Sequence, residues 1–380
     1  MKPATLEFLK KRFSAYYNGE LKGAGAVFLP TSMPQREWGF LFFSESVKAG
    51  MRRHLTFPDE TDLSTYLKTM TPAHVYYSTA YYAHPSAATM QEKEWLGADL
   101  IFDLDADHIV RGSYDMMLSR VKDELYKLID MLTGELGFAK SDLRINFSGG
   151  RGYHIHIPTI AVRSFSSAER RELVNYVSGT GLSLDAMLSS PKSTGWQGRY
   201  RTALASELER IQKLEPLAAR EYLAGLSGIS ERTADSFYKN LAELRGKLLA
   251  NPESLKDNKV IRALTAPENA VFKEAVLSHA AQADEPVTTD IKRLIRHPGS
   301  LHGGSGMRVT PIPLEDLDDF DPLIDAVVFG EEPVTVTTRF PVTMPMLGNT
   351  YEVAEGTSKV PEALAVFLCA RGIAELGGAE

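Results

Sequence analysis

Two carboxylates stand close together in Asp99-Leu-Ile-Phe-Asp-Leu-Asp-Ala-Asp107, at Asp103 and Asp105. On a strand, residues two positions apart point to the same face, so these two acids would lie side by side. Carboxylates held this close repel each other unless a cation lies between them. Hard divalent ions such as Mg²⁺ and Mn²⁺ prefer such oxygen ligands. Because an Asp-x-Asp pattern is short and common, solvated aspartates at a strand end are the alternative.

A second segment combines a flexible turn with a guanidinium and two imidazoles, in Asn146-Phe-Ser-Gly-Gly-Arg-Gly-Tyr-His-Ile-His156. Its glycines permit positive φ and close approach of a ligand, and the N–H groups of such a turn can hold phosphate oxygens. The planar guanidinium of Arg151 also suits phosphate. Taken alone, the glycines would make an ordinary turn, and His154 and His156 would be ordinary buried, hydrogen-bonded histidines. It is less easily explained by chance that the glycine turn and the two histidines both occur in a chain that also has the Asp-x-Asp pattern.

The elements that must position these groups can be recognised from alternation. Leu100–Asp105 and Leu143–Phe147 alternate with the period of a β-strand, and so do residues 153–157. The glycine turn at residues 148–152 should join the last two into a hairpin. A hairpin beside the acid-bearing strand would bring the carboxylates, the guanidinium and the imidazoles together.

A third segment begins at Asp290, in Thr288-Thr-Asp290. The apolar spacing after it predicts a helix from Ile291 to His297, with Asp290 as its N-cap, and Pro298-Gly299 as its end. On the residues alone, Arg293 and Arg296 would form a solvated face.

These segments resemble the signature motifs of the archaeo-eukaryotic primases, and most closely those of the archaeal small subunits. The resemblance lies in Asp103-Leu-Asp105, in Ser148-Gly-Gly-Arg-Gly-Tyr-His-Ile-His156 and in Arg296-His-Pro-Gly-Ser-Leu-His302. Arg36-Glu-Trp-Gly-Phe40 and Lys359-Val-Pro-Glu-Ala-Leu-Ala-Val-Phe-Leu368 are further, weaker matches. The resemblance spans nearly the whole chain, with a gap in the middle.

The resemblance implies roles for individual residues. Asp103, Asp105 and Asp290 would be the catalytic acids that bind two Mg²⁺ or Mn²⁺ ions. The triphosphate of the nucleotide would be held by Ser148, Arg151, His154, Arg296 and His302. Glu37 and Arg53 would lie near the nucleotide sugar and phosphate, although the adjacent Arg52 leaves the register of Arg53 open. His156 would support the orientation of the site.

The activity implied is synthesis of short RNA primers, and DNA primers as well, on a single-stranded DNA template. A ribose 3′-hydroxyl attacks, pyrophosphate leaves, and two metal ions can assist both events. The alternatives are a primase-polymerase of repair or of a mobile element, and a non-catalytic nucleic-acid-binding subunit. The run Arg296 to His302 favours the primase small subunit over these alternatives. The presence of all three acids argues against a non-catalytic subunit. By the same resemblance, the partner would be a primase large subunit, forming a heterodimer.

The expected fold class is α/β, a primase-type fold whose central mixed or antiparallel sheet carries the acids between flanking helices. Residues 203–282 are rich in Ala, Leu, Glu and Lys at helical spacing. We therefore expect an inserted helical subdomain at 203–284, between catalytic segments 1–202 and 285–380, the latter ending in a helix. Short strand-like runs between about Thr310 and Tyr351, such as Val334-Thr-Val-Thr-Thr338, are expected to return the chain to the central sheet.

Net charge and cysteine content limit which kinds of binding site the chain can form. The net charge of −7 argues mildly against a large nucleic-acid footprint. Local basic segments would then contact the template. Residues 192–201 are one such segment, in which Trp196 could stack on a base; the alternative is that they form a plain surface loop. The single cysteine, Cys369, excludes an intrachain disulfide and a multi-cysteine zinc site, so no zinc is expected. His74 and His84 are interpreted as structural.

The start of the chain, Met1 to Arg12, has the pattern of an amphipathic helix rather than that of a signal peptide. No apolar run is long enough to cross a membrane. We therefore expect a cytoplasmic protein with no membrane contact.

Overall fold

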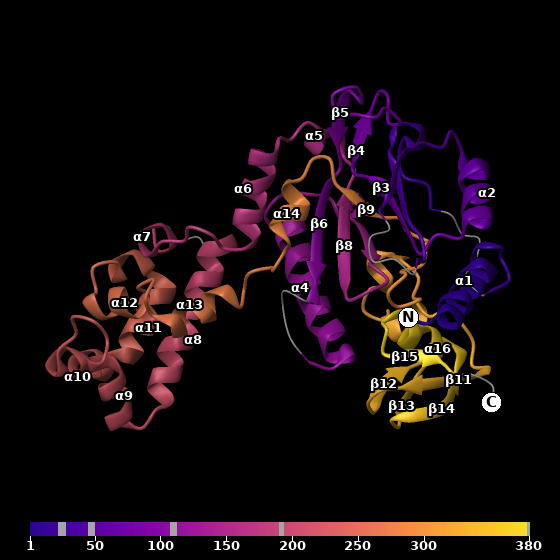
Figure 1. Ribbon diagram of the computed structural model, residues 1–380. Helices are drawn as coiled ribbons and strands as arrows, with labels where there is room; N and C mark the ends of the chain where they lie inside the picture. The colour runs from indigo at the N-terminus through magenta and orange to yellow at the C-terminus, as the bar shows by residue number, and fades with distance from the viewer. Residues whose placement is uncertain (22–27, 45–49, 107–111, 190–193, 378–380) are drawn as a thin grey trace. The chain divides into compact units, whose positions relative to one another are not determined.

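The chain folds into two units, as seen in a computed structural model that describes residues 1–21, 28–44, 50–106, 112–189 and 194–377 (Figure 1). The first unit comprises Met1–Leu125, Ala139–Glu172 and Ala283–Glu380. The second comprises Tyr126–Phe138 and Leu173–Gln282. The helical unit thus begins earlier than the expected boundary at residue 203. That boundary would cut through α8 (Gly195–Lys213), which is one continuous helix.

Two four-stranded sheets organise the first unit, and every neighbouring pair in them is antiparallel. One sheet has the order β2-β1-β3-β9, from β1 (Trp38–Leu41), β2 (Arg52–Leu55), β3 (His74–Ser78) and β9 (Leu294–Arg296). The other has the order β10-β7-β8-β6, from β6 (Leu100–Asp105), β7 (Arg144–Phe147), β8 (Gly152–Ile157) and β10 (Thr310–Ile312). The expected mixture of sheets and helices is confirmed, and the acid-bearing sheet is antiparallel.

The register of the acid-bearing sheet separates a polar face from an apolar one. Asp103 pairs with His154, which pairs in turn with Asn146, so the three side chains share a face. The alternate residues, such as Phe102 and Ile155, are fully buried on the opposite face. At the start of the long helix α4 (Tyr114–Gly134), the hydroxyl of Tyr114 donates to the carbonyl of Gly150 in the turn between β7 and β8. The hairpin of β7 and β8 next to the acid-bearing strand is therefore confirmed.

Shorter elements complete the first unit. Its N-terminal part contains α1 (Pro3–Tyr17), η1 (Met33–Gln35), α2 (Glu60–Met70), β4 (Ala80–Tyr82) and β5 (Trp95–Ala98). Later come η2 (Lys140–Asp142), α5 (Ile160–Arg163), α14 (Glu285–Thr289), η4 (Leu314–Asp316) and α15 (Pro322–Asp325). The amphipathic start of the sequence is confirmed as α1. The helix α6 (Ser167–Val177) continues from the first unit into the second.

The C-terminal segment forms a sheet of its own. Its strands are β11 (Pro333–Thr338), β14 (Gly356–Pro361) and β15 (Ala374–Leu376), and β12 (Val342–Met346) pairs with β13 (Asn349–Val353). The expected return of the chain to the acid-bearing sheet is confirmed for β10, which pairs with β7, but it is wrong for residues 334–338, because β11 pairs with β14 and β15 instead. The expected terminal helix is present as α16 (Glu362–Ala370), which buries Cys369.

Short helices make up the second unit, as the sequence predicted. Besides α8 they are α7 (Leu184–Met187), α9 (Pro216–Ala224), α10 (Glu231–Lys239), α11 (Leu241–Ala250), η3 (Pro252–Leu255), α12 (Lys259–Leu264) and α13 (Ala270–Leu277). Side-chain caps fix where several of them begin: Ser230 accepts from Thr233 N, and Asn258 accepts from Val260 N and Ile261 N. Among the helices described, none is both long and apolar enough to span a membrane.

The interpretation of residues 192–201 as a template-binding loop is wrong where the structure describes it. Trp196 is 5% exposed, and its Nε1 donates to the carbonyl of Tyr176 at 2.5 Å. Arg199 forms ion pairs with Asp130 and Glu135. The indole is thus part of the core of the helical unit and is not available for stacking on a base. Lys192 lies outside the described residues.

Candidate active site

Asp103 and Asp105 lie on the polar face of β6, and both are half-buried. Nε2 of His154, on the neighbouring strand, is 3.3 Å from Oδ1 of Asp103. Burial raises the pKa of Asp103 to about 7, and the charges of Asp105 and Asp284 add to the rise. Arg293 and Arg296 act in the opposite direction. A carboxyl group whose ionisation is this unfavourable is one that a nearby cation would stabilise.

Asp284 is an acid that the sequence analysis missed. Its backbone N–H donates to the carbonyl oxygen of Asp103 at 2.8 Å, at the start of α14, which packs against β6. Its charge is among the causes of the raised pKa of Asp103. The signal in the sequence was Asp284-Glu-Pro286, an N-cap followed by a proline in the first turn of a helix.

Asp290 occupies a different position from the one expected. It is exposed and follows α14, and its Oδ1 accepts a hydrogen bond from the backbone N–H of Lys292 at 2.9 Å. Its charge acts on Tyr82 and on Arg170. The role of Asp290 as a metal ligand stays a prediction, and the acid that touches the strand of Asp103 is Asp284.

The expected helix from Ile291 to His297 is wrong. Residues 294–296 form β9, the edge strand of the first sheet, with Ile295 opposite Tyr77. Asp290 therefore closes a helix rather than opening one. Local apolar spacing indicated a helix, but pairing with β3, which is distant in sequence, determines the conformation.

The glycine turn is held from within. The hydroxyl of Ser148 accepts from the N–H groups of Gly150 at 3.3 Å and Gly152 at 3.2 Å. Gly149 has φ +74°, and a Cβ on Gly152 would clash with the carbonyl oxygen of Leu104. Glycine is thus required by the backbone at both positions. Ser148 shapes the turn, and its contact with phosphate stays a prediction.

His302 and Arg296 lie next to this turn. A Cβ on Gly150 would be 3.2 Å from Nε2 of His302, so this imidazole lies directly against the turn. Burial lowers the pKa of His302 well below its usual value, and Arg296, His74, Arg371 and Arg151 lower it further. The predicted residues Arg151, Arg296 and His302 therefore share one electrostatic neighbourhood with the charges around Asp103.

His74 belongs to this neighbourhood, although its sequence context suggested only a structural role. Its Nδ1 is 2.6 Å from Nη1 of Arg296 and also accepts from the N–H of Gly303 at 3.3 Å. Two donors on one nitrogen require that Nδ1 be unprotonated, and burial together with Arg296 lowers the pKa of His74 to about 3. A neutral His74 thus fixes the guanidinium that is predicted to hold phosphate.

Glu37 forms a separate cluster with Lys93, which is also buried, and with Arg53, which is partly exposed. Glu37 is fully buried and accepts from Nε and Nη2 of Arg53 at 3.1 and 3.2 Å, while Nζ of Lys93 lies at 3.1 Å. Burial would raise the pKa of Glu37, but Arg53 and Lys93 outweigh it and hold the pKa below its usual value. Arg52 instead contacts the hydroxyl of Tyr66 at 3.2 Å, so Arg53 is the one of these two arginines that pairs with Glu37. Lys93 was missed by the sequence analysis.

The donor set fits a hard divalent cation in its chemistry. Asp103, Asp105 and Asp284 are oxygen donors whose mutual repulsion a cation would relieve. Among the residues described, no three acidic, imidazole or thiol side chains converge closely enough to enclose an ion.

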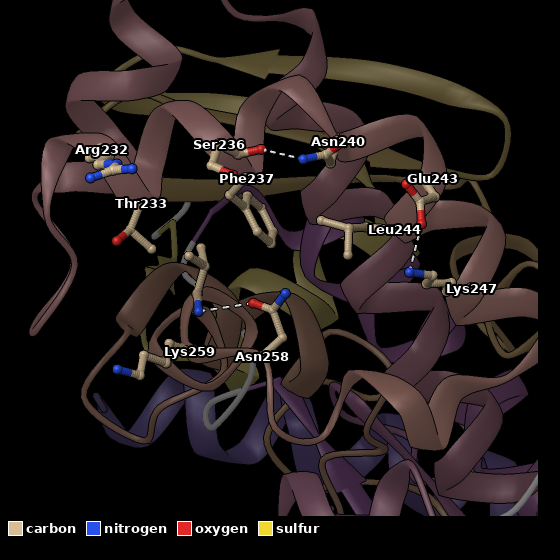
Figure 2. Close-up of a pocket in the computed structure, with 11 residues that line it drawn as sticks. Arg232, Thr233, Ser236, Phe237, Asn240, Glu243, Leu244, Lys247, Asn258 and Lys259 are labelled. Atoms are coloured by element: carbon tan, nitrogen blue, oxygen red, sulfur yellow. Dashed lines mark hydrogen bonds and ion pairs between the residues drawn. The ribbon is translucent and has the colours of Figure 1, made fainter.

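The helical unit offers a groove of a different kind. Figure 2 shows this groove, of about 550 Å³, between α10, α11 and the start of α12. Its acid, Glu243, is paired with Lys247 at 2.6 Å. Arg232 and Lys259 make the rest of the charged lining basic. The groove therefore lacks the close carboxylates that distinguish the site on β6.

A sequence model of the DNA primase small subunit family matches residues 102–314, which include the acid-bearing strand, the glycine turn and His302. The chain belongs to this family. It is 65% identical over 378 residues to a protein of Methanocorpusculum labreanum named DNA primase small subunit PriS, covering 100% of both chains. Proteins with the same name from Methanosphaerula palustris and Methanospirillum hungatei are 51% and 46% identical, covering 99% and 100% of this chain and 99% and 98% of theirs. The family expected from the motifs is confirmed.

Proposed function

We propose that this chain is the catalytic small subunit of a DNA primase. It would synthesise short RNA primers, and DNA primers as well, on single-stranded DNA, by nucleotidyl transfer with release of pyrophosphate. The observation that carries the proposal is the Asp103–His154 pair, with Asp105 and Asp284 beside it, in a chain that matches named primase small subunits along its whole length. The full-length match favours a replicative primase over a repair or mobile-element enzyme.

Asp103, Asp105 and one further acid would hold two Mg²⁺ or Mn²⁺ ions. Such ions activate the attacking 3′-hydroxyl and stabilise the leaving pyrophosphate. We propose Asp284 as the further acid, because it is hydrogen bonded to Asp103 through its backbone and contributes to the raised pKa of that residue. Asp290 is the alternative that the family motif suggested.

The cationic and imidazole groups have a complementary task. Arg151, Arg296 and His302 would bind the triphosphate, and Arg296 is held in place for this by His74. His154 is buried and its pKa lies well below the usual value, so it stays neutral at physiological pH. Its Nε2 therefore orients the carboxyl of Asp103 without neutralising its charge. Glu37, Arg53 and Lys93 carry a net positive charge that would favour the nucleotide phosphates.

The partners we propose are a primase large subunit in a heterodimer, a single-stranded DNA template and nucleoside triphosphates. The name small subunit, carried by the relatives, supports the first. The helical groove with Arg232 and Lys259 on its rim is a basic surface that template backbone could contact.

Primer synthesis on single-stranded DNA tests the proposal directly. Labelled ribo- and deoxynucleotides are supplied with Mg²⁺ or Mn²⁺, and Asp103→Asn is run in parallel as the control. Short products from the wild type and none from the variant are expected. The proposal fails if neither makes products, even with a pre-annealed primer and with the large subunit added.

A further inference from the structure

His156 is the second histidine of the glycine-turn motif, and the only role predicted for it is to support the orientation of the site. It lies two residues beyond His154 on the same face of β8, and it pairs with Ile101 and Arg144 rather than with Asp103. Its Nδ1 is 3.1 Å from the hydroxyl of Tyr77, and the two rings are stacked with 27° between their planes. His156 is 3% exposed, and in the described part of the chain its Nε2 has no hydrogen-bond partner. A buried ring nitrogen without a protein partner can hydrogen bond to a molecule that lies beside it.

A cavity of about 330 Å³ adjoins this imidazole. His156, Asn146 and Tyr77 supply its buried polar surface, and each is 5% exposed or less. Pro158, Pro298 and Pro311, with two further prolines, supply flat apolar surface. Every lining residue belongs to the first unit. The volume is at the lower end for ligand pockets, which fits a small planar molecule rather than an extended one.

The polar groups indicate what kind of planar molecule would fit. Burial, then the charges of Arg36 and Arg144, lower the pKa of His156 to about 3, so Nε2 offers a neutral hydrogen bond. The amide of Asn146 makes one long bond, from Nδ2 to the carbonyl of Arg144 at 3.4 Å, and an amide can pair with the edge of a base. Asp99 adds no uncompensated charge, because its oxygens accept from Arg36 at 2.7 Å and from Tyr81 at 2.6 Å.

The entrance of the cavity differs from its interior. Phe28 is 42% exposed there, and Arg144 is also exposed. Nη1 of Arg144 makes only a long contact of 3.4 Å with the hydroxyl of Thr31. An aromatic ring and a guanidinium at the entrance suit a ring system that continues into a sugar and a phosphate. Neutral hydrogen-bonding groups inside and a cation outside correspond to the two ends of a nucleotide.

We propose that the cavity bounded by His156, Asn146 and Tyr77 binds a nucleobase, with its sugar directed toward Arg144. The base comes either from a free nucleotide or from a nucleic acid strand. The cavity is separate from the triphosphate site, because Arg151 and His302 lie at the turn end of β8 while His156 lies toward its other end. It is also close to the catalytic acids. His156 is two positions from His154 on β8, a separation of about 7 Å, and His154 lies opposite Asp103.

Binding to the full-length chain, without metal, tests this proposal. Adenosine, cytidine and AMP are titrated and followed by ligand-observed NMR, and a short oligonucleotide is then added as a competitor. His156→Phe keeps the ring against Tyr77 but removes the nitrogen, and it should weaken nucleoside binding at least tenfold. Arg144→Ala changes an exposed residue, so it should fold normally and should weaken AMP binding while leaving adenosine binding unchanged.

The controls separate this site from catalysis. Asp103→Asn should abolish primer synthesis yet bind adenosine as the wild type does. The binding result therefore tests the cavity even if the chain proves not to synthesise primers. Binding of the oligonucleotide, with no binding of free nucleosides, would assign the base to a strand. The proposal is overturned if wild-type protein binds none of these probes at millimolar concentration. It is equally overturned if both variants, melting cooperatively, bind every probe as tightly as the wild type.

Discussion

The two units differ in how deeply their ion pairs are buried. In the first unit, Arg36–Asp99 at 2.7 Å and Lys93–Glu37 at 3.1 Å are buried pairs that join segments distant in sequence. The described pairs of the second unit are more exposed than these two: Lys239–Asp235 and Lys247–Glu243, each at 2.6 Å, are exposed pairs within one helix, and Arg199–Glu135, which joins separate segments, keeps 15% and 13% of its side chains exposed. Burying charge is costly, whereas exposed pairs cost and contribute little. The unit that carries the costly charges is the one that carries the acids of the proposed active site.

The largest expected effect follows from breaking a buried pair. Arg36 is fully buried, stacks over the ring of Tyr81 at 3.6 Å and donates to Asp99. Arg36→Met would leave the carboxylate of Asp99 buried without its cation, at a cost of about 3–5 kcal/mol in the free energy of unfolding. Urea denaturation measures this change. A loss below about 1 kcal/mol would remove the contrast between the two units.

The acids of the site provide the next test. Asp284→Asn should reduce primer synthesis by on the order of 10²-fold, because it removes charge beside Asp103, while Asp290→Asn should stay within a few-fold of the wild type. The two substitutions are chemically identical and six residues apart, so each controls for the other. The reverse order of effects would restore Asp290 as the third acid.

How much of this site could be foreseen from the sequence depends on how local each signal is. The strand of Asp103, the hairpin and the pairing with His154 follow from alternation and from a turn that needs glycine, which are properties of neighbouring residues. The conformation of residues 294–296 was missed, because it is determined by pairing with β3 far away in the chain. The prediction that Trp196 stacks on a base was wrong for a similar reason. The ring is buried in the core of the helical unit, where its Nε1 donates to the carbonyl of Tyr176, and this contact cannot be seen in the local composition.

The contacts of His74, which was interpreted only as structural, and of Lys93, which was missed, could not be predicted from the sequence for the same reason. Neither stands in a recognisable motif, and each acquires its role only when the fold brings it to Arg296 or to Glu37. Asp284 differs, because its N-cap signal was visible in the sequence and the motif match drew attention to Asp290 instead.

The pH dependence of stability should report the carboxyl group of Asp103. The pKa of Asp103 is raised to about 7 in the folded chain, so the unfolded state releases this proton at a lower pH than the folded state does. This residue therefore makes stability fall as pH rises from about 4 to about 7. Asp103→Asn should remove that slope and be more stable than the wild type at pH 8 by on the order of 1–3 kcal/mol, with little difference at pH 4. Denaturation of both proteins across this range measures the slope, and parallel curves would contradict the assignment.

The smallest effect is expected in the helical unit. Lys247 and Glu243 lie one turn apart on α11 at the edge of the groove in Figure 2, and both side chains are about half exposed or more. Water already solvates both charges, so Lys247→Met should leave the urea midpoint unchanged within error, at low and at high salt. It serves as the matched counterpart of Arg36→Met, since each replaces one cation of a single pair by methionine. A loss in Lys247→Met comparable to that in Arg36→Met would mean that the helical unit, too, depends on its charges, and that burial does not distinguish the two units.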